Sequence, residues 1–463
     1  MRKFFEGHSL VGVVILFCVF FFAVFLRFYD IGTQSPWTDE LASWWYLRHL
    51  DMVWVRESHS PLYYALLRVF TGPSGDLSTL RVFSAVISVI HLIECFFLGQ
   101  LVFDKKRFLL FWILICLNPA DIVYARMARH YAWLMEGILV YYLLWRIRAP
   151  FWLELLTGAF MGFIHVFAVI PISFLAMYRW WNDRRTRELC WRLICTNLIV
   201  VYYVLRILFL GHESVRSNVS WNSLGSIKFW SSLLTQFLGD AYPRFEFFPV
   251  NAWLALGVVG LTGIFILVRR KESGILYIGI LVASLLVIEA LSFWLNLRTN
   301  RYLIYLLAFW IVAFVDSFKD VKQWQAISIM GVVVSFLFFQ NPIRTFPWEK
   351  EKVSEWKEFR MKYPGTQELV CSNIYQSDYY DLHSVELCRK DFLHVDRQGP
   401  LLFFDLNGND IFVAVQLMQE MDVEDYSKLK YGLIARFVPK LPHPQKIAQK
   451  KSTKRPGKER KKK

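Results

Sequence analysis

Cysteine and charge are both scarce in this chain of 463 residues, and each scarcity excludes a class of protein. Five of the seven cysteines lie in or beside apolar runs, where cysteine behaves as a small hydrophobic residue, so a disulfide scaffold is excluded. The other two, Cys371 and Cys388, share a polar region and would pair if it faces an oxidising compartment. Charged residues make up 20% against 55% hydrophobic residues, an apolar share above that of soluble proteins.

Two further absences bear on the apolar runs. No internal repeat is visible, whereas many transporters are built from repeats. The first run extends to Leu26, which is long for a signal peptide, and bulky residues at Phe25–Tyr29 replace a small-residue cleavage site. We therefore expect an uncleaved first helix.

Long hydrophobic runs fill most of residues 1–344. They lie at about 10–26, 82–103, 108–123, 131–145, 151–178, 190–210, 250–268, 275–295, 302–316 and 324–340. The run 151–178 is too long for one span and contains His165 and Pro171, which predicts two short helices meeting near His165. The sequence thus predicts an all-α polytopic membrane protein of about eleven transmembrane helices.

Basic islands between the runs predict the orientation. They lie at 104–107, 146–148, 179–187, 269–271 and 319–322. Their alternation fits the positive-inside rule with a cytoplasmic N-terminus. The other side then carries 27–80, 118–130, the turn at His165, 211–249, 295–301 and everything after Asn341. The basic tail disagrees with this orientation, although tails that follow folded domains translocate largely regardless of charge.

The C-terminal quarter differs in kind. Residues 345–440 are polar and contain strand-like runs at Glu368–Cys371, Leu401–Phe404 and Gly432–Val438. They predict a small soluble α/β or α+β domain after a membrane module of residues 1–344. Residues 441–463 are interpreted as a disordered basic tail, in which ten Lys or Arg and one Glu contribute +9 to the net charge of +15. That concentration makes the charge a poor sign of nucleic-acid binding.

Adjacent carboxylates stand out in the first outer loop, at Asp39 and Glu40 in Ser35-Pro36-Trp37-Thr38-Asp39-Glu40. One of them would take a proton from an acceptor hydroxyl, or both would hold a divalent cation near a phosphate. Alternatively, they begin a surface helix, where acids suit the N-terminal dipole.

The same loop continues through His59 to Tyr63 and Tyr64. His59 would donate a hydrogen bond to a phosphate oxygen near the bilayer interface. The tyrosines suit a substrate site or an aromatic belt, and the belt is the favoured interpretation of their position.

A cationic stretch lies between two apolar runs. Its sequence is Tyr124-Ala125-Arg126-Met127-Ala128-Arg129-His130-Tyr131. Guanidinium groups bind phosphate through a bidentate fork, so Arg126, Arg129 and the adjoining Tyr131 are candidates for a substrate site. Arginines at helix ends also snorkel to the interface, which is the alternative.

Three more candidates fall on the predicted outer side. His165 lies within an apolar run, where a lone histidine is more often a satisfied core residue than a ligand. Arg298 and Arg301 repeat the pattern of outer cations before a helix. Each signal is weak alone, but all of these residues share one side under a topology derived only from charge.

In their order along residues 1–310, these motifs resemble the GT-C superfamily of polyprenyl-phosphate-sugar-dependent transferases, near the protein O-mannosyltransferase and aminoarabinose transferase branch. The shared motifs are Trp-x-Asp-Glu, His-x-Pro-Leu-Tyr-Tyr, Ala-Arg-x-Tyr, His-x-Phe and Arg-Tyr-Leu. They begin at Trp37, His59, Ala128, His165 and Arg301.

The resemblance implies a GT-C-like fold and an inverting glycosyltransferase. Asp39 corresponds to the base that deprotonates the acceptor hydroxyl, with Glu40 beside it. His59 lies where relatives place a residue near the lipid phosphate, and Arg129 and Arg301 correspond to phosphate or sugar contacts. Relatives often have Gln-Glu where this chain has Arg126-Met127, so a second acidic ligand is missing. A divalent cation, if one is needed, would rest on Asp39 and Glu40 alone.

The implied partners are a polyprenyl-phosphate-linked sugar donor, membrane lipid, and an acceptor that is a protein, a glycolipid or a polysaccharide. The compact chain favours a bacterial inner membrane over the endoplasmic reticulum. Two alternatives remain open, namely a membrane transporter or lipid-sugar flippase, and a non-catalytic scaffold or receptor that acts through residues 345–440.

Overall fold

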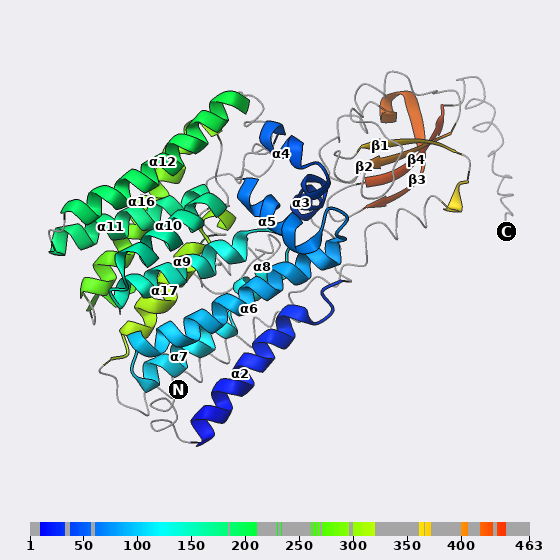
Figure 1. Ribbon diagram of the computed structural model, residues 1–463. Coiled ribbons are helices and arrows are strands. Elements are labelled where there is room, and N and C mark those ends of the chain that lie inside the picture. The colour runs from blue at the N-terminus through cyan, green and yellow to red at the C-terminus, as the bar shows by residue number, and fades with distance from the viewer. Residues whose placement is uncertain are drawn as a thin grey trace, which may run out of the picture. The chain divides into compact units, whose positions relative to one another are not determined.

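The chain folds as two compact units, residues 1–34 with 42–348 and residues 35–41 with 349–463. The computed structural model describes residues 10–32, 38–56, 61–183, 186–210, 229, 233, 260, 263–264, 266–268, 271–295, 300–319, 361–364, 366–371, 400–405, 417–428 and 433–440. These residues are mostly helical, with a small sheet near the C-terminus (Figure 1).

The described helices from α2 to α12 follow one another with short connections, and α16 and α17 come later in the chain. In chain order they are α2 (Leu10–Phe28), α3 (Thr38–Arg48), α4 (Leu50–Arg56), α5 (Pro61–Thr71), α6 (Leu77–Val102), α7 (Lys105–Cys116), α8 (Pro119–Ala125), α9 (Tyr131–Arg146), α10 (Phe151–Ile164), the 3-10 turn η1 (Val166–Ala168), α11 (Val169–Asp183), α12 (Thr186–Leu210), α16 (Lys271–Leu295), the 3-10 turn η3 (Asn300–Leu303) and α17 (Tyr305–Asp316).

Three of the described helices are long and apolar enough to cross a membrane. They are Val11–Phe28, Leu77–Val102 and Gly274–Ser292. Helices α7 and α8 would form a fourth span if they act as one, although they meet at an angle of 49°. The prediction of a membrane protein is therefore supported at this coarse level, while the figure of about eleven spans stays a prediction.

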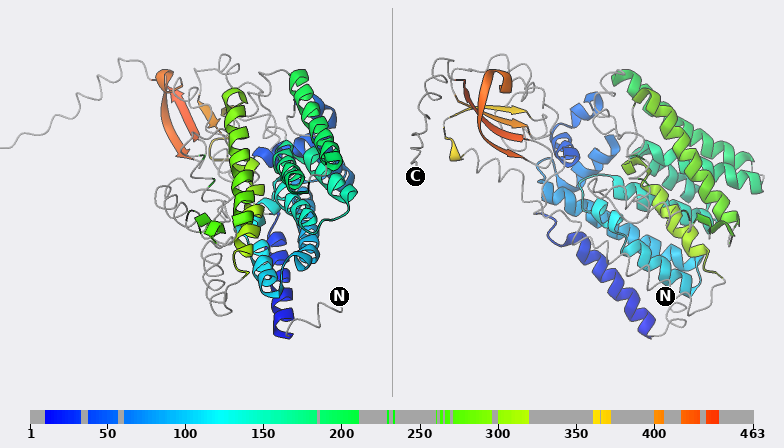
Figure 2. Two further views of the ribbon diagram at one scale, coloured as in Figure 1. Left: turned by 90° about the vertical axis from the view of Figure 1, so that its left-hand side faces the viewer. Right: turned by 180° about the vertical axis from the view of Figure 1, so that it is seen from behind.

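Helix α9 forms the centre of the helical unit. Its residues from Tyr131 to Leu144 are all buried, and it packs against α6, α8, α10 and α17. A helix that is apolar around its whole circumference belongs in the interior of a bundle. Figure 2 shows α9 and its neighbours from two further directions.

The run 151–178 divides as its sequence predicts. Helix α10 ends at Ile164, His165 adopts an extended conformation, and α11 begins at Val169 after the turn η1. Arg179 near the end of α11 hydrogen-bonds to Glu154 in the first turn of α10, so the chain reverses at His165. Two short helices that meet at His165 are confirmed.

Arginines from three of the basic islands, Arg107, Arg146 and Arg179, gather at one end of this unit, here called the basic end. Asp316, which ends α17, accepts hydrogen bonds from Arg107 at the start of α7 (3.2 Å) and Arg146 at the end of α9 (2.5 Å). Glu154 accepts from Arg179 (2.6 and 2.8 Å) and Arg192 (2.8 Å). Each carboxylate thus joins two arginines from different helices, which accounts for the close approach of several cations.

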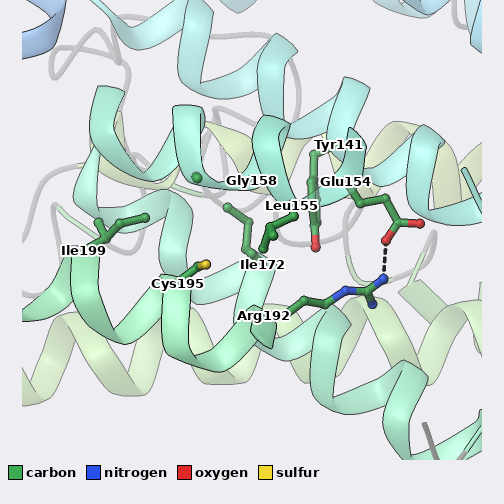
Figure 3. Close-up of a pocket in the computed structure, with 9 residues that line it drawn as sticks. Tyr141, Glu154, Leu155, Gly158, Ile172, Arg192, Cys195 and Ile199 are labelled. Carbon is green, nitrogen blue, oxygen red and sulfur yellow. Dashed lines mark hydrogen bonds and ion pairs between the residues drawn. The ribbon is translucent and has the colours of Figure 1, made fainter. Parts of the chain in front are cut away.

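A narrow crevice lies beside the pair formed by Glu154 and Arg192 (Figure 3). Its walls come from α9, α10, α11 and α12 and are largely apolar, with Tyr141 and Cys195 among them. The two charged groups on its edge bind each other. The ion pair between Arg192 and Glu154 links α12 to α10, so we assign the crevice a structural role.

The C-terminal unit contains a four-stranded sheet with the order β1-β2-β4-β3. Its strands are β1 (Gln367–Cys371), β2 (Leu401–Asp405), β3 (Met421–Lys428) and β4 (Leu433–Pro439). Strands β1 and β2 are parallel, and the other pairs are antiparallel. The expectation of strands in a small C-terminal domain is confirmed, and three of the four match predicted runs.

The edge strand β3 was not predicted, because its sequence MDVEDYSK is mostly polar. Asp425 on this strand accepts hydrogen bonds from Lys362 Nζ and Tyr363 Oη, both at 2.6 Å. These two hydrogen bonds hold the pKa of Asp425 below its ordinary value. The polar strand is therefore joined to the segment around residue 362 by its side chains.

We predict that Glu154→Gln destabilises the helical unit by about 3–5 kcal/mol, because it leaves two largely buried arginines without their carboxylate. Glu188→Gln is the matched control, since Glu188 is 31% exposed and lies 3.9 Å from the same Arg192. The control should change stability by less than about 1 kcal/mol. Thermal unfolding in detergent measures both, and equal effects would contradict the role assigned to Glu154.

Candidate functional site

The turn between α8 and α9 carries the cationic stretch identified in the sequence. Asn118 caps α8 by accepting a hydrogen bond from the backbone of Asp121 (3.1 Å), and Pro119 occupies the first helical position. The short helix ends at Ala125, and α9 begins at Tyr131. Residues 126–130 are all buried, so two guanidinium groups lie inside the helical unit.

Arg126 binds the backbone end of the first helix. Its Nη1 donates to the carbonyl of Leu26 (2.8 Å) and to that of Tyr29. Carbonyls at a helix C-terminus lack intrahelical donors, and a cation there also suits the helix dipole. The geometry thus gives Arg126 a capping role on α2, and its predicted contact with substrate stays a prediction.

Arg129 points to a different helix. Its Nη1 donates to the hydroxyl of Tyr64 on α5 (2.8 Å), and the neighbouring Tyr63 packs its ring 5.2 Å from the ring of His130. Both tyrosines are fully buried. Burial contradicts the favoured interpretation of an aromatic belt, since belt residues face the lipid interface.

His165 reaches the same place from the break between α10 and α11. Its Nδ1 accepts the backbone N–H of Phe167 (3.2 Å), so the neutral ring carries its proton on Nε2. The ring lies 4.9 Å from His130 and 5.5 Å from Tyr302. His165 is thus not an isolated core residue but one of a paired set of imidazoles.

Four separate parts of the chain therefore supply one buried group of side chains. We call it the Arg129 cluster, which consists of Tyr63, Tyr64, Arg129, His130, Tyr131, His165 and Tyr302. It includes the predicted residues Tyr63, Arg129, Tyr131 and His165. His130 and Tyr302 were missed as site residues, although they adjoin Arg129 and Arg301 in the sequence.

The remaining predicted residues are placed less fully. The backbone of Arg301 lies in η3 beside Tyr302, while its side chain lies outside the described residues, as do His59 and Arg298. Asp39 and Glu40 begin α3 and are 4% and 1% exposed. They start a helix, as one interpretation held, but the helix start is buried. Both belong to the unit of residues 35–41 and 349–463.

The carboxylate pair does not fit a shared metal ion well. Consecutive residues on a helix project about 100° apart, so Asp39 and Glu40 do not face each other. Within the described part of the chain, no group of three or more His, Cys, Asp or Glu could hold a metal ion.

A buried ionic network joins α2, α6, α8 and α9 and was not predicted. Arg27 Nε donates to Ser88 (2.7 Å), its Nη2 forms an ion pair with Asp121, and Glu136 lies 3.7 Å from the same nitrogen. Ser88 in turn donates to Glu136 (2.6 Å). A lone acid within each of two apolar runs was the signal that could have revealed it.

A scan against protein-family models finds no match to this chain, and a search of curated proteins finds none either. The likeness to GT-C transferases therefore rests on the motifs in the sequence alone.

The charge balance of the network yields a prediction. Two carboxylates and one guanidinium are fully buried together, so one carboxyl proton would make the group neutral. Asp121 pairs more closely with Arg27, which leaves the proton to Glu136. Asp121→Asn should therefore destabilise the protein by about 3–5 kcal/mol.

Glu136→Gln is the matched variant and should change stability by less than about 1 kcal/mol, because the amide oxygen still accepts from Ser88. Unfolding in detergent compares the two variants. A larger loss in Glu136→Gln than in Asp121→Asn would show that Glu136 carries the charge.

Proposed function

We propose that this protein is an integral membrane glycosyltransferase that moves a sugar from a polyprenyl-phosphate donor to an acceptor hydroxyl on the extracytoplasmic face. The observation that carries the proposal is the Arg129 cluster, in which a guanidinium, imidazoles and phenols meet at helix ends and helix breaks. It lies at the start of α9, whose sixteen residues extend about 24 Å to Arg146 at the basic end.

This separation supports the proposed orientation. If the basic end faces the cytoplasm, as the positive-inside rule requires, the Arg129 cluster belongs to the opposite side. A polyprenyl tail would lie between helices, and its phosphate would reach the buried Arg129 cluster from that side.

The chemistry of the cluster suits a departing phosphate. Attack by an acceptor oxygen on the anomeric carbon breaks the bond to the phosphate oxygen, and the phosphate gains negative charge. Arg129, oriented by Tyr64, and the Nε2 proton of His165 are donors for such charge. Donors that are already in position stabilise a developing charge at little reorganisation cost.

Asp39 is the proposed general base, on the strength of the GT-C resemblance. It would take the proton of the attacking acceptor hydroxyl, and the resemblance implies inversion at the anomeric centre. Because Asp39 and Glu40 project in different directions from α3, the proposed mechanism does not have them share a metal ion. Glu40 is proposed to adjoin the base rather than to share its role.

A transporter or lipid-sugar flippase is the second candidate. The buried ionic network at Arg27 favours it, because ionisable residues within membranes often line transport pathways. The other contacts of Arg27 argue against transport. Arg27 also donates hydrogen bonds to the carbonyls of Ala23 and Cys116, so it links helices structurally. An assay of purified protein in vesicles distinguishes the two, since only the transferase releases free polyprenyl phosphate. A scaffold that acts through residues 345–440 would instead lose function when those residues are deleted.

We predict that Asp39→Asn lowers sugar transfer by about 10²–10⁴-fold while the protein still inserts and folds, because the general base is lost. Mass spectrometry of glycans and glycolipids from cells that carry each variant measures the effect. Asp51→Asn is the control, since Asp51 is an exposed acid in the first turn of α4. Full activity of Asp39→Asn would remove Asp39 from the mechanism.

Arg129→Gln should lower transfer by about 10²–10³-fold, as expected when one preorganised donor to the leaving group is removed. Tyr64→Phe should have a smaller effect, because it removes only the hydroxyl that orients Arg129. The control is Arg148→Gln, an exposed arginine near the basic end. Equal activity of Arg129→Gln and Arg148→Gln in the same assay would exclude a phosphate site at Arg129.

A further inference from the structure

Three helices meet at the ion pairs of Glu154, at the basic end of the helical unit. Glu154 on α10 accepts hydrogen bonds from Arg179 on α11 (2.6 and 2.8 Å) and from Arg192 on α12 (2.8 Å). Two guanidinium groups therefore share one carboxylate. The stretch between them adds to the positive charge, because residues 179–192 together with Glu154 contain five arginines and three acids.

Exposed tryptophans surround this group of charges. Trp152, Trp181 and Trp191 are 60%, 65% and 50% exposed. Each is on a different helix and lies one or two residues from a member of the ion-paired group. Tryptophan is enriched where hydrocarbon meets the lipid headgroups, because its ring is apolar and its N–H is polar. Three such residues beside arginines are the pattern expected at the headgroup level of a membrane.

The exposed face of α12 is apolar on the far side of its tryptophan. Ile194, Leu198, Val201 and Leu205 are all exposed. They follow Trp191 at intervals of three or four residues, which places them on one stripe of the helix. An apolar stripe that begins at an interfacial tryptophan suits contact with acyl chains.

The crevice between these helices has a charged edge and an apolar remainder (Figure 3). Glu154 and Arg192 form the edge, and Ala159 and Ile199 line the crevice farther along α10 and α12. Ile199 is seven residues from Arg192, so the apolar part extends about 10 Å along α12. A charged edge that adjoins an apolar groove matches a molecule with a charged head and a hydrocarbon chain.

We propose that an anionic phospholipid binds here as a structural lipid, with its phosphate at the arginine-rich edge and part of one acyl chain in the crevice. Basic pockets between transmembrane helices on the cytoplasmic side are known places for anionic headgroups. The excess of arginine over acid selects an anionic headgroup, and the apolar walls select a lipid over free phosphate. The site lies at the opposite end of α9 from the Arg129 cluster and does not rest on the proposed sugar transfer.

Alkylation of Cys195 by N-ethylmaleimide tests the site in purified full-length protein in a nonionic detergent. Cys195 lines the crevice and is a partly exposed free cysteine. Phosphatidylglycerol at about ten times its dissociation constant should slow the alkylation about tenfold, because only the lipid-free protein reacts. Phosphatidylcholine at the same concentration should have little effect. Mass spectrometry of the peptide that contains Cys195 measures the rate.

Cys18 is the control within the same molecule, since it is an exposed free cysteine on α2. It should react at the same rate in either lipid. Glycerol 3-phosphate, which carries the charge without the acyl chain, should not protect Cys195. Equal protection by the two lipids, equal slowing at Cys18, protection by glycerol 3-phosphate, or no protection at any phosphatidylglycerol concentration would overturn the proposal.

Closing the crevice provides the second test. Ala159→Leu adds bulk to its apolar wall and should weaken phosphatidylglycerol binding about tenfold, as counted by native mass spectrometry of the retained lipid. Ala283→Leu is the matched control, because Ala283 is a half-buried alanine on α16. Equal binding by the two variants would exclude an acyl chain from the crevice and overturn the proposal.

Discussion

The ion pair between Arg27 and Asp121 is the interaction on which the helical unit most depends. It joins the end of α2 to α8, and the neighbouring contacts of Arg27 with Ser88 and Glu136 bring in α6 and α9. All four side chains are fully buried. A buried ion pair adds little net stability over a well-packed apolar pair, but one charge left without the other is strongly unfavourable. The network therefore acts mainly as a constraint on which helices can meet.

That constraint has a direct effect on the candidate site. Asp121 holds α8 from one side, and Arg126 holds its end to the carbonyls at the end of α2. The following turn is thereby anchored before it reaches Arg129, which points instead to Tyr64. Arg126 and Arg129 are three residues apart, and the sequence suggests the same interpretations for both. Their contacts differ, because Arg126 binds helix carbonyls and Arg129 binds a phenol.

The sequence predicted the features that depend on local pattern. The break at His165, the shared end of three basic islands, and the strands at Leu401–Phe404 and its neighbours all follow from periodicity, charge or turn residues. It did not predict features that depend on distant pairing. Nothing near Glu136 indicates Arg27, and nothing near residues 35–41 indicates that they group with residues 349–463. Strand β3 was missed because an edge strand needs few apolar residues.

The two ends of α9 use cations in different ways, and this difference bears on function. At the basic end, Asp316 and Glu154 each bind two arginines, so moving any one of these arginines away would break a charge pair in a poorly solvated place. Around Arg129, the described contacts include phenols and imidazoles, which donate or accept hydrogen bonds while neutral. Such groups can donate to a phosphate without a change in their own charge. The basic end is thus held by ion pairs between helices, whereas the Arg129 cluster places one guanidinium beside neutral hydrogen-bonding groups.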